Sequence, residues 1–594
     1  MKKSLALWLC LLTFPLYGAV KLEDLSAEEQ LGQTLVAFVD IDSAELVRPV
    51  IEQGKLGGVL IQWGNYSLKE TRRLIEKLQG WAARSPHKIP LLISIDYEGG
   101  TVYTPITLGF DYLPTNMLLA ASQDEEKVAT LAYLAGQQLR NVGVHINFSP
   151  VLDVNSNPRN PIIGVRSFGA DPATVTKMGM ALLNGFKAAG IVPIVKHFPG
   201  HGDTFLDSHH AVPVVNLSKA ELTRTHLAPF AQAIAQGVQG VMTGHVMYPA
   251  LDDRNVASFS VPILQGLLRE KMGFDGLIVT DSLDMKGATQ FCTVAGCAAR
   301  SLAAGADMIL LGRYIKPLTL FDQIDDHVKE QKLTARVGQA ARRILQLKKQ
   351  LGLLDEGFVR QPPASIERAY RQTLAQISKE AVTLVRDRAG MIPFSPKQAR
   401  PTVCAVFFAP PRFADQLAHI SKPFLARNYH VRTYNASLSP KEKDVTRALK
   451  CVDGADLVVA ASLQWADKLN LNQKRTLEKM LDKNPNMVFL SVMNPYDIPH
   501  YPRMGTVLAT YGLNSFALQT AADIIVGNEQ AQGVLPVDLP ERAQRSTSSA
   551  PVPMPQQPAH SLALQRKPLF FLRRSRTYSM TAGRTEITII ATIT

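Results

Sequence analysis

One short segment of this 594-residue chain concentrates side chains that can transfer protons. Residues 196–209 read KHFPGHGDTFLDSH, so three histidines, two aspartates and one lysine fall within 14 positions. Gly200 and Gly202 let the backbone turn sharply after Lys196 and His197. The segment therefore predicts a mobile loop above an active site, from which an acid could be delivered to a substrate.

Two kinds of chemistry fit such a cluster. A metal site requires converging ligands at a defined spacing, such as two histidines one helical turn apart, and no such pair falls on a predicted helix. The alternative is an imidazole whose protonation is controlled by a carboxylate, which orients the ring and favours its charged form. Asp207 and His209 are two residues apart in an extended chain, so they are predicted to form this dyad, and no metal or other cofactor is expected.

A second segment ends an apolar run with a carboxylate. Residues 276–285 read GLIVTDSLDM, in which a predicted strand leads directly to Asp281. A carboxylate in that place can attack an anomeric carbon, as the nucleophile of a retaining glycosidase does. The other interpretation is a helix N-cap, and it is the one that we favour for Asp284.

The elements that position these residues follow a repeating pattern. From residue 27 to about 355, short apolar runs alternate with amphipathic stretches, as in repeated βα units. Eight such runs predict a (β/α)8 barrel of the TIM type, whose chemistry belongs at the C-terminal ends of the strands. Asp96, Lys196, His197, His245 and Asp281 all lie at or next to the end of a run. The runs are 33–39, 58–62, 90–96, 145–149, 191–197, 240–245, 277–281 and 308–311.

A smaller α/β domain is predicted after the barrel. A Lys/Arg-rich helix at about 334–352 and a linker with Gly357, Pro362 and Pro363 place the boundary near 360. We therefore expect the barrel at 20–360 and an α/β sandwich domain at 361–540, with residues 532–537 as its closing segment. Its predicted strands are 381–385, 403–408, 457–461, 487–492 and 507–511, and no Gly-rich phosphate loop follows them.

Both ends of the chain differ from these domains. Residues 1–19 have the charged, apolar and small-residue regions of a signal peptide, and an apolar run of about 14 residues is shorter than the roughly 20 that span a bilayer. An exported periplasmic or secreted protein is expected, with no stable membrane span after signal removal. The tail at 541–594 holds eight Lys/Arg and two Glu, which is +6 of the net charge of +13.

That charge leaves two interpretations of the tail: a solvated segment, or one attracted to acidic polymers of the cell envelope. No motif for nucleic acid accompanies it.

Apolar residues make up 46% and charged residues 19% of the chain, which is typical of globular proteins. Cys292, Cys297, Cys404 and Cys451 have no metal-ligand spacing, and export would permit disulfides whose pairing the sequence does not assign.

The chain resembles glycoside hydrolase family 3, and within it the β-N-acetylglucosaminidase branch. The hallmark is the loop at 196–204 followed by Asp207, Ser208 and His209. The similarity extends over about residues 27–355, and the second domain resembles the family's sandwich domain through residues 509–511 and 533–537. Other matching segments are 96–100, 149–154, 157–169 and 242–245.

The resemblance implies a retaining hydrolase that removes terminal β-linked N-acetylglucosamine from glycans, such as peptidoglycan fragments. It implies that Asp281 is the nucleophile and that His209 is the acid/base, held by Asp207. His201 and His245 are expected to shape the site. The residues expected to bind sugar hydroxyls and the N-acetyl group are Asp96, Arg166, Lys196 and His197.

One departure from the family pattern is the pair Thr101 and Thr104, where arginines are common, and Tyr97 replaces the usual Gln. A sugar contact is therefore predicted to be missing. Three alternatives stay open: a β-glucosidase or xylosidase of the same family, a phosphorylase, since a histidine acid does not repel phosphate, and a catalytically silent wall-binding protein. The sequence carries no signal of oligomeric state.

Overall fold

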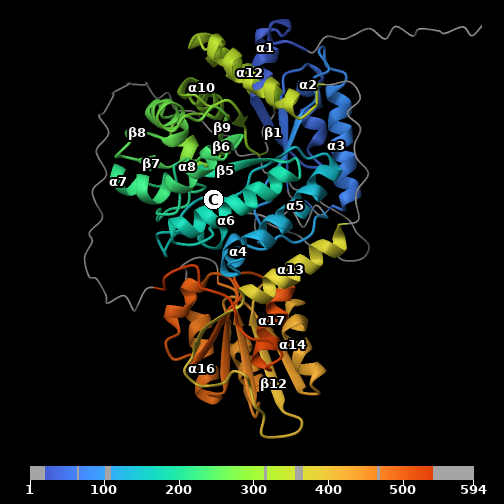
Figure 1. Cartoon of the computed structure of the whole chain (residues 1–594), viewed down its shortest axis with the longest axis vertical. Coiled ribbons are helices and arrows are strands. Elements are labelled where there is room, and N and C mark those ends of the chain that lie inside the picture. The colour runs from blue at the N-terminus through green and yellow to red at the C-terminus, as the bar shows by residue number, and fades with distance from the viewer. Residues whose placement is uncertain are drawn as a thin grey trace, which may run out of the picture. The chain divides into compact units, whose positions relative to one another are not determined.

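The structure, a computed structural model, describes residues 20–62, 64, 66–100, 109–313, 317–354, 366–464 and 469–539 (Figure 1). These residues belong to one unit, Met1–Arg542. The predicted signal peptide at 1–19, Thr101, Thr104 and the tail at 541–594 lie outside the described residues, as does the linker at 355–365.

Eight parallel strands form the barrel, in the order β10-β1-β2-β3-β4-β5-β6-β9. A parallel bridge from Val279 to Met308 joins β9 to the β10 side and brings the ends of the sheet together. The prediction of a (β/α)8 barrel is confirmed, because each of the eight apolar runs coincides with one strand to within a few residues. The strands are β1 (Leu35–Val39), β2 (Gly58–Ile61), β3 (Leu92–Ile95), β4 (Ile146–Asn147), β5 (Val192–Phe198), β6 (Gly240–Thr243), β9 (Leu277–Thr280) and β10 (Ile309–Leu310).

The barrel interior is a packed core and not a pore. Side chains from several strands, such as Val36, Leu60, Leu92 and Met242, are at most 3% exposed and belong to one cluster inside the ring. Burial of such branched and long apolar chains stabilises the barrel by about 1.5–3 kcal/mol each. The mouth at the C-terminal ends of the strands is left for polar residues.

Helices surround the barrel, and their ends follow capping signals in the sequence. The Asp124 and Asp171 side chains accept hydrogen bonds from the first turns of α5 and α6, and Pro172 opens α6. Gly143 ends α5 with φ +98°. The α-helices of this part are α1 (Ala27–Thr34), α2 (Ala44–Glu52), α3 (Leu68–Ala82), α4 (Asn116–Ala121), α5 (Glu125–Val142), α6 (Pro172–Ala188), α7 (Lys219–Glu221), α8 (Ala228–Ala235), α9 (Lys286–Thr289), α10 (Val294–Ala304), α11 (Pro317–Glu330) and α12 (Thr334–Gln350).

Shorter elements complete the barrel domain. A two-stranded hairpin, β7 (Met247–Tyr248) with β8 (Asp252–Val256), follows β6 and was not predicted. Asp284 was predicted as a helix N-cap, which is wrong: Met285 holds that position for α9, and Asp284 accepts from Ser282 Oγ and Arg313 N instead. The other helical turns are Leu22–Asp24, Gly164–Arg166, Leu222–His226, Ala257–Phe259 and Pro262–Lys271.

The second domain is a six-stranded sheet in the order β11-β16-β15-β14-β12-β13, parallel except for β11 (Figure 1). Five of its strands overlap the predicted runs, and the edge strand β13 is additional. The strands are β11 (Thr383–Asp387), β12 (Thr402–Phe408), β13 (His430–Ala436), β14 (Leu457–Ser462), β15 (Met487–Ser491) and β16 (Thr506–Ala509). The helices are α13 (Glu367–Ala381), α14 (Gln416–Ala426), α15 (Glu442–Val452), α16 (Leu471–Lys483) and α17 (Ser515–Ile525), with turns Pro411–Phe413 and Pro495–His500.

Hydrogen bonds join the two domains at both ends of α4 and in the segment after β4. The predicted closing segment contributes to this contact: Val534 N donates to the Ala121 carbonyl of the barrel, while Gly533 N donates to the Val382 carbonyl within the second domain. The other bonds include Asn155 Nδ2 to Tyr496 Oη at 3.0 Å, Thr115 Oγ1 to the Tyr511 carbonyl at 2.6 Å and Ala170 N to the Pro536 carbonyl at 3.1 Å.

The cysteines and the helices supply two further facts. Disulfides join Cys292 to Cys297 and Cys404 to Cys451, a pairing that the sequence alone did not assign. Within the ranges that the structure describes, none of the helices has the length and apolar character needed to cross a bilayer.

Candidate active site

The predicted site residues gather at the C-terminal end of the barrel strands. Asp96 follows β3, Lys196 and His197 lie at the end of β5, and Asp281 follows β9. Arg166 lies in the turn Gly164–Arg166, which comes after β4. The loop after β5 carries the remaining two predicted residues, Asp207 and His209.

A buried network of charged side chains connects the segments at the C-terminal ends of β3, β4 and β5. Lys196 Nζ is 2.8 Å from Asp96 Oδ1 and 2.5 Å from Glu98 Oε1. Arg166 donates to both Glu98 oxygens, at 2.8 and 3.0 Å. Burial opposes ionisation of Glu98, but Arg166 and Lys196 lower the pKa of this carboxyl group to about 2. Although burial favours the neutral amine, Asp96 and Glu98 raise the pKa of Lys196, so the network is ionised.

Glu98 was not among the predicted binding residues. It is 1% exposed and holds two of them, Arg166 and Lys196, in place. The signal for it was the D-Y-E-G-G segment at 96–100, which the resemblance already marked. A buried carboxylate between two cations fixes both donors, because its removal would leave buried positive charge less well compensated.

His197 is oriented by a second carboxylate that was also not predicted. Its Nδ1 lies 2.6 Å from Asp153 Oδ2, and its Nε2 lies 3.3 Å from Arg166 Nη2. A guanidinium can only donate, so Nε2 accepts and the Nδ1 proton points to Asp153. Burial opposes ionisation of Asp153, but His197 and His201 lower its pKa to about 2. Asp153 stands in the S-P-V-L-D-V segment at 149–154.

The structure brings Asp207 and His209 into direct contact. His209 Nδ1 is 2.7 Å from Asp207 Oδ1, and the His209 amide donates to the same oxygen at 2.9 Å. The Asp207 hydrogen bond raises the pKa of His209 above 6.5. Burial opposes this with a smaller effect, and the charge of Asp281 acts in the same direction as Asp207. Although burial favours the neutral acid, the His209 bonds lower the pKa of Asp207 to about 2. The imidazole therefore holds its proton to higher pH than a free histidine does.

His201 holds the loop that carries this dyad. Thr204 Oγ1 donates to the His201 carbonyl, so it accepts from His201 Nδ1 at 2.9 Å. His201 Nε2 then accepts from Ser208 Oγ at 3.1 Å. Burial lowers the pKa of His201 to about 4, which fits this neutral form. The expectation that His201 shapes the site agrees with these bonds.

Two glycines permit the turn at the start of the loop. Gly200 has φ +128°, which few other residues adopt. At Gly202 a Cβ would lie 1.7 Å from the Val154 carbonyl oxygen, so no larger residue fits there. The loop can therefore pack directly on the segment that follows β4.

Asp281 presents an ionised carboxylate at the barrel mouth. Its backbone amide donates to the Thr243 carbonyl at 3.1 Å, and the Ser282 amide donates to Oδ1 at 2.7 Å. Burial opposes ionisation, but electrostatic interaction with His197, His245, His209 and Lys196 lowers the pKa of Asp281 below 3.8. His245 itself is fully buried, and its Nε2 lies 3.0 Å from the Ser282 carbonyl oxygen.

These residues combine an ionised carboxylate with an imidazole that retains its proton, beside a fixed set of buried donors. Such an arrangement suits nucleophilic attack coupled to proton donation. Over the ranges that the structure describes, no group of three or more His, Cys, Asp or Glu side chains could hold a metal ion.

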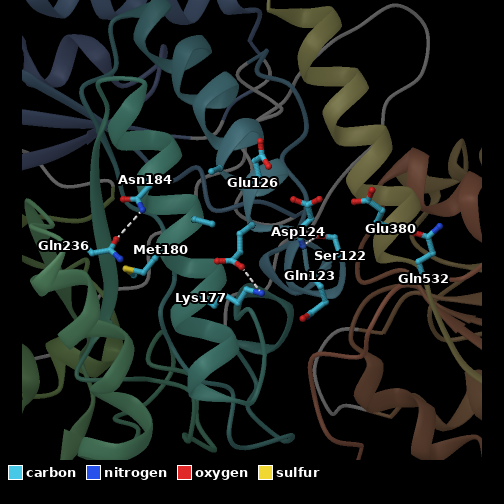
Figure 2. A pocket seen from close by; sticks show the side chains of 13 residues that line it. Ser122, Gln123, Asp124, Glu126, Lys177, Met180, Asn184, Gln236, Glu380 and Gln532 are labelled. Atoms are coloured by element: carbon cyan, nitrogen blue, oxygen red, sulfur yellow. Dashed lines mark hydrogen bonds and ion pairs between the residues drawn. The ribbon is translucent and has the colours of Figure 1, made fainter.

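A surface depression of about 820 Å³ lies away from these residues, between α5 and α6 of the barrel domain and Glu380 and Gln532 of the second domain (Figure 2). It shares no residue with the charge network or the dyad. Its polar side chains partly satisfy one another, as in the 2.8 Å pair of Lys177 with Glu125 and the 3.3 Å bond from Asn184 to Gln236. Its lining is Ser122, Gln123, Asp124, Glu125, Glu126, Ala129, Lys177, Met180, Ala181, Asn184, Gln236, Glu380 and Gln532.

Comparisons with known proteins agree with the geometry. The family model described as "Glycosyl hydrolase family 3 N terminal domain" matches residues 26–347, which include all eight barrel strands and every predicted site residue. A beta-hexosaminidase A of Pseudoalteromonas piscicida is 29% identical over 561 residues, covering 82% of this chain and 90% of the relative.

Two solved structures extend the likeness to both domains. A glycoside hydrolase family 3 beta-N-acetylglucosaminidase from Paenibacillus sp. str. FPU-7 has a TM-score of 0.78 and 31% identity, covering 87% of this chain and 99% of that one. A beta-glucoside phosphorylase bound to 2FGlc has a TM-score of 0.76 and 25% identity, covering 87% and 95%.

Proposed function

We propose, from the premise that this chain belongs to glycoside hydrolase family 3 and is a hydrolase of its β-N-acetylglucosaminidase branch, that it is a retaining exo-enzyme acting on peptidoglycan fragments. The observation that carries the mechanism is the pairing of an ionised Asp281 with a His209 whose pKa is raised by Asp207. One group is ready to attack and the other to donate a proton at the same pH.

The first chemical step forms a covalent intermediate. An Asp281 oxygen attacks the anomeric carbon of the terminal N-acetylglucosamine, and the bond from that carbon to the leaving-group oxygen breaks. The imidazolium of His209 gives its proton to that oxygen, so the leaving group departs as a neutral alcohol. Asp207 stabilises the imidazolium before the transfer.

The second step reverses these roles. Neutral His209 takes a proton from a water molecule, and the resulting hydroxide oxygen bonds to the anomeric carbon while Asp281 leaves. Two inversions give net retention. The exposed position of His209, whose side chain is 47% accessible, suits a group that must meet both a leaving group and water.

The buried network supplies the sugar contacts. Lys196, Arg166 and His197 present nitrogen atoms fixed by Glu98 and Asp153, and the Asp96 oxygens can accept from paired hydroxyls. We assign these groups to the hydroxyls and N-acetyl group of the terminal sugar. An exported location, periplasmic or secreted, is part of the proposal and rests on residues 1–19.

Phosphorolysis is a second candidate, favoured by the histidine donor and by the likeness to a solved β-glucoside phosphorylase. A neutral or cationic imidazole does not repel phosphate as a carboxylate does. Analysis of the sugar product with and without phosphate separates the two reactions. Free N-acetylglucosamine in both conditions supports hydrolysis, and the 1-phosphate replacing it supports phosphorolysis.

The deciding experiment measures release of nitrophenol from a nitrophenyl β-N-acetylglucosaminide by the native protein, Asp281→Ala and His209→Ala, with circular dichroism as the folding control. We expect Asp281→Ala to lose activity by a factor of about 10⁴ or more, and His209→Ala to lose less, since nitrophenol needs little protonation. A folded native protein without activity on this substrate or on peptidoglycan fragments would support the wall-binding alternative. Preference for a β-glucoside would support the glucosidase alternative.

A further inference from the structure

Two large apolar side chains are exposed on the loop that carries the acid/base dyad. Phe205 is 57% exposed and Leu206 is 49% exposed, directly before Asp207. Thr204, which precedes the pair, is 0% exposed, and Ser208, which follows Asp207, is 3% exposed. Single exposed apolar residues are common, but an adjacent pair on a catalytic loop is a candidate contact for a ligand.

A cation accompanies the exposed ring. The guanidinium carbon of Arg159, an exposed residue of the segment after β4, lies 4.8 Å from the centre of the Phe205 ring. The contact orients the guanidinium through the negative face of the ring. Among the described residues no ion pair joins Arg159 to a carboxylate, so its charge is available to a ligand.

Asparagine side chains anchor both members of this pair. Asn157 Nδ2 donates to the Thr204 carbonyl at 3.0 Å, and Asn157 Oδ1 accepts from the Arg159 amide at 3.0 Å. Asn160 Nδ2 donates to Thr204 Oγ1 at 3.2 Å. The backbone under Arg159 is therefore fixed to the backbone that leads into Phe205, which makes the pair a built surface and not two independent loop tips.

Its position follows from the chemistry of His209. The acid must touch the oxygen of the leaving group, while the terminal sugar occupies the buried contacts around Lys196. Phe205 lies four residues before His209 on the same anchored loop. The nearest part of a substrate is thus the leaving group, and not the sugar that is transferred to Asp281.

We infer that Arg159 and Phe205 form the platform for the leaving group and select a saccharide that carries a carboxylate. The apolar face of the sugar ring stacks on Phe205, and its acid pairs with the Arg159 guanidinium. This inference rests on the proposed function, because it assigns the leaving-group side of that same reaction.

Three substrates that share a terminal N-acetylglucosamine test the platform. The β-fluoride has a leaving group that needs neither the platform nor a proton donor, chitobiose leaves a neutral sugar, and N-acetylglucosaminyl-β-1,4-N-acetylmuramic acid leaves a sugar with a carboxylate. The values of kcat/KM are compared for native protein, Phe205→Ala and Arg159→Gln. Arg412→Gln is a matched control, because Arg412 makes the same 4.8 Å contact with Phe413 in the second domain.

We expect Phe205→Ala to lower kcat/KM about tenfold for both disaccharides and to leave the fluoride unchanged. Arg159→Gln should lower it about tenfold for the acidic disaccharide only, and 0.5 M salt should shrink that difference by screening the charge. Arg412→Gln should match native protein on all three substrates.

The pattern of kcat/KM across the three substrates separates the platform from a purely structural role of the pair and from the proposed function. Equal losses on the fluoride and both disaccharides would mean that the pair only maintains the loop, which overturns the platform. Variants identical to native protein on the disaccharides would overturn it too, while native hydrolysis of the fluoride preserves the proposed function. Native protein inactive on all three substrates would overturn both.

Discussion

At the scale of single residues, the pH dependence of catalysis should report the contact between Asp207 and His209. Because Asp207 raises the pKa of His209 above 6.5, the acid stays protonated past that pH, and kcat/KM should fall only as the pH rises through the raised value. Asp207→Asn removes the main cause, so this alkaline limb should move to lower pH and the rate at pH 7.5 should fall about tenfold or more. A pH profile of kcat/KM with chitobiose measures the shift.

The acidic limb provides an internal reference for that experiment. Asp281 has a pKa below 3.8, so its protonation should limit the rate only in strong acid, in both proteins. His210→Ala is the matched control, since His210 is 82% exposed and 3.9 Å from Asp207. An alkaline limb that stays fixed in Asp207→Asn would mean that another group sets the proton affinity of His209.

Site residues could be predicted from sequence where side-chain type and strand ends coincide. Asp96, Lys196 and Asp281 each stand at the end of an apolar run, and barrel topology then requires them to converge. Glu98 and Asp153 were not assigned roles, because a buried carboxylate gains its role from cations that are distant in sequence: Glu98 is 68 residues from Arg166, and Asp153 is 44 from His197. Periodicity carries no signal for such pairings.

At the scale of elements, apolar runs located every strand of the barrel because strands buried on both faces are continuous in apolar residues. The strand β13 was missed since it lies at the sheet edge, pairs only with β12 and has the polar sequence HVRTYNA. The hairpin β7–β8 was missed for a related reason: DDRNV in β8 is largely exposed and lacks the alternation of a half-buried strand.

The loop after β5 offers a test of how one backbone contact positions the dyad. In Gly202→Ala the new Cβ would meet the Val154 carbonyl at 1.7 Å, so the loop must move away from the segment after β4. We expect kcat/KM to fall at least about 100-fold, because displacement of a proton donor by 1 Å is enough for such a loss. The β-fluoride substrate should lose much less, since its leaving group needs no proton.

Gly266→Ala serves as the control for that substitution. A Cβ at Gly266 meets nothing within 4 Å, so the helical segment Pro262–Lys271 accepts it. Activity should be unchanged and the melting temperature equal or slightly higher, as expected for Gly to Ala in a helix. A Gly202→Ala protein with native kcat/KM on disaccharides would show that the loop does not need its packing on Val154.

At the scale of the whole molecule, the second domain contacts the barrel where Arg166 is held. Asn155 Oδ1 accepts from the amide of Gly164, the first residue of the Gly164–Arg166 turn, and Asn155 Nδ2 donates to Tyr496 Oη of the second domain. Beside them, Asn116 Nδ2 donates to the Arg166 carbonyl at 2.6 Å. The preceding residue, Thr115, bonds to the second domain through the Tyr511 carbonyl. The second domain therefore supports two asparagines that fix the backbone of Arg166.

Tyr496→Phe tests whether this support reaches the chemistry. Loss of the hydroxyl leaves the buried amide of Asn155 with a poorer partner, which costs about 1–3 kcal/mol and loosens the turn that orients Arg166. We expect a lower melting temperature together with a rise in KM for the β-fluoride, which probes only the terminal sugar. Tyr434→Phe is the control, because its hydroxyl bonds to Asp444 within the second domain at 2.7 Å. It should lower stability alone; if both variants lose stability and neither changes KM, the second domain stabilises the barrel without positioning Arg166.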